Sequence, residues 1–62
     1  MTHNVRITVS WYVNEKWSLE RRTYSLRGKS RKHILDKALA MAKKWENYKI
    51  REDIAEIEVE II

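Results

Sequence analysis

The chain has no cysteine, no proline and a single glycine, Gly28. Without cysteine, neither a disulfide framework nor a thiolate metal site can form. The two histidines lie far apart in the sequence, so a zinc site is not expected either. No apolar run approaches the ~20 residues that a membrane-spanning helix needs, and no signal peptide is visible. These absences predict a cytoplasmic protein without metal, cofactor or membrane attachment.

Acidic residues are scarce in the middle of the chain. Between Lys16 and Lys44 only Glu20 and Asp36 oppose ten lysines and arginines, whereas in the last seventeen residues six acidic residues oppose only Lys49 and Arg51. The net charge is +4. Such asymmetry is typical of a nucleic-acid-binding face, and the alternative is a solvated surface with internal charge pairs. With 62 residues, 44% of them hydrophobic, the chain is predicted to form one folded domain over residues 1–62.

Two strands are indicated in the first half. Apolar and polar residues alternate over residues 4–13, which is typical of a half-buried strand. A polar break at residues 14–16 predicts a hairpin, followed by a second strand over residues 17–27. The apolar positions of that strand change from odd at Trp17 and Leu19 to even at Tyr24 and Leu26. We therefore expect a β-bulge near residues 20–22, the alternative being that Trp17 leaves the core face at the hairpin end.

A helix is predicted after Gly28, with Ser30 as its N-cap and an end near Asn47. One helical face collects apolar side chains, namely Ile34, Leu35, Ala38, Leu39, Met41, Ala42 and Trp45. A last strand over residues 54–61 alternates isoleucine and valine with Glu56, Glu58 and Glu60, for which Arg6 is the expected partner.

The β-β-α-β order predicts an α+β fold with a three-stranded antiparallel sheet in the order 2-1-3 and one helix packed on one face. The connection from the second strand through the helix skips one strand, so the first strand becomes central. The three tryptophans are expected in the core rather than as platforms for stacking bases, because large aromatics supply much of the burial in a small core.

The start of the predicted helix is unusually basic, with the sequence Gly28-Lys29-Ser30-Arg31-Lys32-His33. A helix N-terminus already carries about half a positive charge from its unpaired N–H groups, so cations there are unfavourable. Local rules are most often broken where a chain has a function. A bound phosphate, held by main-chain N–H groups with Lys29, Arg31 and Lys32, would make this arrangement favourable.

The sequence gives little indication of a catalytic function. Gly28-Lys29-Ser30 matches the end of a phosphate-binding P-loop, but Thr23 stands where the first glycine is required. His33 has no nucleophile or orienting carboxylate beside it in the sequence, and Asp36 is expected to pair with Lys32 or Lys37. We therefore predict a protein that is not an enzyme.

The favoured prediction is a non-catalytic nucleic-acid-binding module, for DNA or RNA, with affinity that is mostly electrostatic. Its contacts are predicted at Gly28, Lys29, Ser30, Arg31 and Lys32, extended by Arg27, Arg21, Arg22 and Lys37, with Arg6 and Tyr12 as secondary contacts. One alternative is a protein-interaction module or homodimer that uses open sheet edges. Its general pattern is similar to that of many small phage-encoded proteins that bind host enzymes, although no motif carries this likeness. Another is an engineered scaffold without activity.

Overall fold

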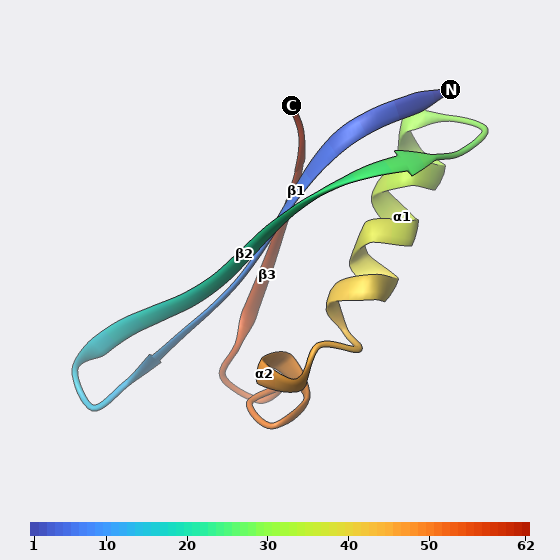
Figure 1. The fold of residues 1–62 in the computed structure, drawn as a ribbon. Helices are drawn as coiled ribbons and strands as arrows, with labels where there is room; N and C mark the ends of the chain where they lie inside the picture. The colour runs from blue at the N-terminus through green and yellow to red at the C-terminus, as the bar shows by residue number, and fades with distance from the viewer.

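The chain forms a three-stranded sheet with one helix across it, in a computed structural model that describes all 62 residues. In chain order the elements are β1 (Thr2–Val13), β2 (Lys16–Arg27), α1 (Arg31–Ala42), the short helix α2 (Glu46–Lys49) and β3 (Glu56–Ile61). β1 lies between β2 and β3 and is antiparallel to both (Figure 1). The predicted α+β fold and the strand order 2-1-3 are confirmed.

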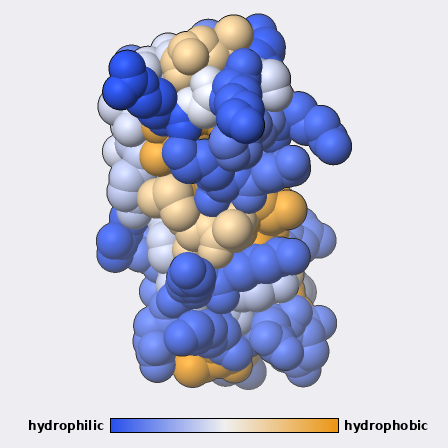
Figure 2. All heavy atoms as spheres, turned by 90° about the vertical axis from the view of Figure 1, so that its right-hand side faces the viewer, coloured by the Kyte–Doolittle hydropathy of each residue, from blue (hydrophilic) through white to orange (hydrophobic).

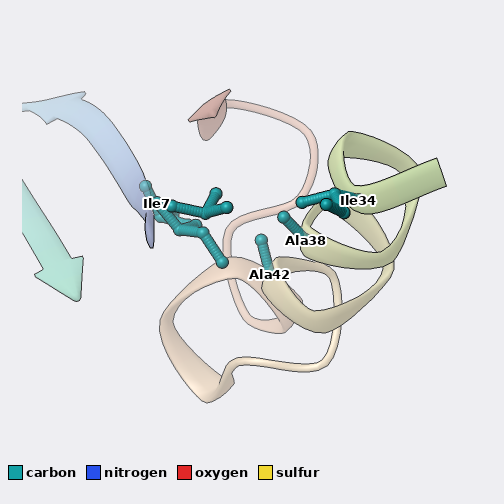
Figure 3. Packing of buried hydrophobic residues seen from close by; sticks show 6 residues of the cluster. Ile7, Ile34, Ala38 and Ala42 are labelled. Atoms are coloured by element: carbon teal, nitrogen blue, oxygen red, sulfur yellow. The ribbon is translucent and has the colours of Figure 1, made fainter. Parts of the chain in front are cut away.

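The core lies between β1 and α1 and consists of six fully buried side chains. β1 contributes alternate residues, as its sequence pattern predicts, and α1 contributes one residue per turn. The six are Val5, Ile7, Val9, Ile34, Ala38 and Ala42. Figure 3 shows Ile7 pointing from the sheet toward Ile34, Ala38 and Ala42 on the helix. The two alanines allow the helix to approach the sheet closely, and no residue of β2 is buried.

The hairpin of β1 and β2 has no bulge. Its register runs without interruption from Val13 opposite Lys16 to Thr2 opposite Arg27, so the predicted bulge is wrong and the alternative holds. Trp17 lies on the sheet face opposite α1 with 65% of its surface exposed, and the prediction of three core tryptophans is wrong for this residue. A bulge would move Trp17 to the helix face of the sheet. No helix covers β2 near the hairpin end, so Trp17 would gain no burial there.

The hairpin end projects away from the helix (Figure 1). Its two-residue turn has positive φ at Asn14 (54°) and Glu15 (60°), which is the geometry of a type I′ turn. The molecule is elongated as a result, with extents of 41 × 18 × 15 Å. None of the helices has the length and apolar character that crossing a membrane requires.

α1 ends at Ala42, five residues before the predicted end at Asn47. Trp45 adopts extended backbone (φ −68°, ψ 140°) and α2 begins at the next residue. The Trp45 ring lies 6.5 Å from the Tyr24 ring, between centroids, and the Arg22 guanidinium lies 5.2 Å from its centroid. These contacts with β2 favour the turn over continued helix, because tertiary packing overrides the weak helix propensity of a short segment.

Candidate nucleic-acid interface

The loop between β2 and α1 is fixed by main-chain hydrogen bonds to the start of β1. The Gly28 N–H donates to the Met1 carbonyl, and the Met1 ammonium donates to the Gly28 carbonyl, both at 3.0 Å. Ser30 is the N-cap, as predicted, and its Oγ accepts the His33 N–H at 3.2 Å. The Lys29 N–H donates to His33 Nδ1 at 3.1 Å, so His33 stabilises the loop through its own side chain.

The first turn of α1 presents unpaired N–H groups among cationic side chains. The N–H groups of Arg31 and Lys32 have no acceptor in the chain. The side chains of Lys29, Arg31 and Lys32 are exposed, and the first turn holds no acidic residue. The two ion pairs in the structure, Arg6–Glu60 and Arg22–Glu20, both lie elsewhere. The acidic end of the chain therefore leaves the helix start unneutralised, and we call Lys29, Arg31 and Lys32 the basic helix start.

Gly28 is required by close packing rather than by its backbone angles, since its φ is not positive. A Cβ at this position would lie 2.9 Å from Ile34 Cγ1 and 3.3 Å from His33 Nδ1. Ile34 is fully buried in the core and cannot move aside without disturbing it. The glycine thus lets the loop turn tightly over the first core residue of the helix.

Gly28→Ala is expected to destabilise the fold by about 1–3 kcal/mol, because the added methyl group overpacks the site against Ile34. Urea unfolding followed by circular dichroism measures the change, with Ser25→Ala on the exposed end of β2 as the matched control. An unchanged midpoint for Gly28→Ala would contradict the close packing of this loop.

The remaining predicted contacts divide between the two faces of the sheet. Lys37 lies in the second turn of α1, and its Nζ reaches back to donate to the Arg27 carbonyl at the end of β2. Arg21 lies on the face opposite α1, where its Nε donates to Thr8 Oγ1 at 3.0 Å. Arg22 lies on the helix face with Glu20 Oε2 2.7 Å from its Nη2. Adjacent strand residues point to opposite faces, so the register places Arg21 and Arg27 on the face opposite α1 and Arg22 on the helix face. Of the predicted extensions, Lys37 lies nearest the basic helix start on α1 itself.

Arg22 belongs to a structural network on the helix face. A hydrogen bond with the Tyr24 side chain and the nearby Glu20 carboxylate raise the pKa of the Arg22 guanidinium above its ordinary value. The other Glu20 oxygen accepts from Asn47 at 3.1 Å, and Asn47 Oδ1 in turn accepts from Arg51 at 3.0 Å. These bonds tie β2 to α2, so the charge of Arg22 is already engaged.

Two expectations about acidic partners have opposite outcomes. Arg6 pairs with the glutamates of β3 as predicted, its Nε donating to Glu60 Oε1 at 2.8 Å. Asp36 pairs with neither Lys32 nor Lys37, and that prediction is wrong. Lys37 instead reaches the Arg27 carbonyl, which the sequence could not indicate because that contact depends on where β2 ends relative to α1.

Sequence reasoning missed an exposed cluster at the hairpin end, formed by Tyr12, Trp17 and Leu19. The rings of Tyr12 and Trp17 lie 5.2 Å apart between centroids, on the face opposite α1. The change of apolar phase within β2 is the sequence signal for this cluster. In a strand without a bulge, Trp17 and Leu19 must lie on the other face of the sheet from Tyr24.

The candidate interface is an open surface. No pocket is present in the structure, and no three histidine or acidic side chains lie close enough together to hold a metal ion. Figure 2 shows the helix-bearing side of the molecule, where hydrophilic side chains predominate and hydrophobic atoms form small patches. The chain matches no protein-family model, no curated protein and no solved structure.

Proposed function

We propose that the protein binds the phosphate backbone of a nucleic acid through the basic helix start, without catalysis. The observation that supports this most is the combination of two unpaired N–H groups, at Arg31 and Lys32, with three cationic side chains that have no acidic partner. A phosphate oxygen satisfies such N–H groups, and its charge is stabilised by the positive end of the helix dipole. Lys37 continues the cationic surface on the next turn of α1.

The charge distribution favours a polyanion over a single small anion. Four cationic side chains lie on the loop and on the first two turns of α1, namely Lys29, Arg31, Lys32 and Lys37. A site without a pocket encloses no small ligand, whereas a phosphate backbone gains from each cation in turn through release of its condensed counterions. Glu56 and Glu58 of β3 would repel that backbone, so it is expected to follow the loop and helix rather than the last strand.

Fluorescence anisotropy with a labelled duplex and a labelled single strand tests this proposal. If about three phosphates are neutralised, affinity for duplex DNA should fall about 40-fold between 50 and 200 mM salt, since log K changes by roughly −0.9 per phosphate for each unit of log salt. Binding that is absent at low salt, or that does not respond to salt, would rule the proposal out.

A further inference from the structure

The sheet face opposite α1 is covered by no other element of the chain, and we call it the open face. It carries alternate residues of all three strands. These include Arg6, Thr8, Ser10 and Tyr12 of β1, Trp17, Leu19, Arg21 and Thr23 of β2, and Glu56, Glu58 and Glu60 of β3. Two features of this face distinguish it from an ordinary solvated surface.

The first feature is the apolar cluster of Tyr12, Trp17 and Leu19, whose side chains are 51%, 65% and 57% exposed. Trp17 is the most exposed large hydrophobic residue of the chain. β3 pairs with β1 only as far as Ser10, which faces Glu56, so no glutamate of β3 pairs beside the two aromatic residues. A cluster of contiguous exposed apolar side chains with a charged surround is typical of an interaction surface.

The second feature is the separation of charge across the open face. Thr8 is flanked by Arg21 on β2 and Glu58 on β3, in the same row of the sheet. Neighbouring strands are about 4.8 Å apart, so the backbones carrying these two charges are roughly 10 Å apart. Neither charge has an ion-pair partner within the chain, whereas Glu60 is neutralised by Arg6. One edge of the face is thus basic and the other acidic.

We propose that the open face binds a second copy of this chain in a two-fold symmetric dimer. A two-fold axis parallel to β1 places β2 of each copy over β3 of the other and leaves every row in register. Arg21 of each copy then faces Glu58 of the other, and the contact occurs twice, as symmetry requires. The small residues Thr8 and Ser10 lie along the axis, and the aromatic rings of both copies meet at the hairpin end.

The charges also exclude the other face-to-face arrangement. An axis perpendicular to the strands would stack β2 on β2 and β3 on β3, which places arginine against arginine and glutamate against glutamate. Like charges brought together across an interface repel each other and disfavour association. The first arrangement is therefore selected, with two sheets about 10 Å apart and strands within roughly 30° of parallel.

The area of the open face indicates how tightly the two copies are expected to bind. The molecule extends 41 × 18 Å in its two longest directions, so the area of the open face is at most close to the ~800 Å² per partner of a standard interface. An interface of this size without a large apolar core is expected to have micromolar affinity. α1 lies on the other side of the sheet, so the dimer leaves the basic helix start of both copies free. The inference therefore stands independently of nucleic-acid binding.

Sedimentation equilibrium from about 1 μM to about 1 mM protein measures the association. We expect the mass to rise toward twice the 7.5 kDa of one chain. Trp17→Ser should weaken the dimer about 30-fold, whereas Ile50→Ser, which alters a side chain of similar exposure outside the open face, should leave it unchanged. Circular dichroism confirms that each variant is folded.

Charge reversal tests the geometry separately from the apolar cluster. Arg21→Glu and Glu58→Arg should each weaken the dimer at least ~10-fold, and the double variant should restore affinity to within about threefold, because the reversed charges again face each other. A monomer at every concentration overturns the inference. A dimer whose affinity does not change in these variants also overturns it, because the two copies would then pair through strand edges. If the chain is a monomer and Trp17→Ser abolishes oligonucleotide binding, the occupant of the open face is a nucleic acid instead.

Discussion

Ile7→Ala is expected to leave the chain largely unfolded at 37 °C. Ile7 is fully buried in the middle of β1, and it packs on Ile34, Ala38 and Ala42 of the helix (Figure 3). Truncating a buried isoleucine to alanine typically costs about 2–5 kcal/mol, from lost transfer free energy and the cavity that remains. A domain of 62 residues has a total stability of roughly 3–9 kcal/mol. With only six fully buried side chains, the core has no other group that could compensate.

Thermal and urea unfolding, followed by circular dichroism, measure this loss. Ile7→Val is a milder companion that should cost about 0.5–1.5 kcal/mol and keep the transition measurable. Ile50→Ala removes the same atoms from a side chain that is 59% exposed and should change stability by no more than about 0.5 kcal/mol. If Ile7→Ala and Ile50→Ala unfolded at the same midpoint, the core would not lie between β1 and α1.

The sequence predicts those parts of the fold that follow from local pattern. The alternation around Val5, Ile7 and Val9 identifies β1, and Ser30 before an apolar periodic segment identifies the start of α1. The strand order follows from a crossover through the helix that skips one strand, which places the last strand beside the first. All of these predictions hold in the structure.

The sequence predictions are wrong where the local structure depends on which strands the helix covers. The change of phase in β2 has two solutions, a bulge or an exposed Trp17, and only the position of α1 decides between them. Likewise Trp45 is in phase with Ala38 and Ala42 on a helical wheel, so the pattern continues past the true end of the helix. The contacts of Trp45 with Tyr24 and Arg22 end it sooner, and they join segments distant in the sequence.

The candidate interface was likewise predictable only in the part that depends on local sequence. The composition of the loop identifies the basic helix start, because five consecutive residues supply three cations and an N-cap. Whether the acidic end of the chain neutralises those cations depends on tertiary structure, and in the structure Glu60 pairs with Arg6 instead. Alternation within β2 also separates Arg21 from Arg22, so a basic stretch of sequence does not become one basic surface.

Replacing Lys29, Arg31 and Lys32 together by glutamine is expected to weaken oligonucleotide binding about 100-fold or more at 0.1 M salt. Each lost phosphate contact removes one counterion-release contribution, and the slope of log affinity against log salt for duplex DNA should flatten by about 0.9 per contact. The same variant should be slightly more stable than the unsubstituted chain, by up to roughly 1 kcal/mol at low salt, because these cations oppose the helix dipole. Anisotropy titrations and urea unfolding measure the two effects.

The opposite signs of these two effects make the prediction specific. A variant that lost binding because it folded poorly would lose stability at the same time, whereas this one should lose binding and gain stability. Lys16, Lys43 and Lys44 provide the matched control, because their replacement by glutamine removes the same charge from exposed positions that make no side-chain hydrogen bond. That control should weaken binding only through its reduced net charge, by less than about tenfold. If both triple variants lost affinity equally, binding would depend on overall charge rather than on the start of α1, and the proposed interface would be wrong.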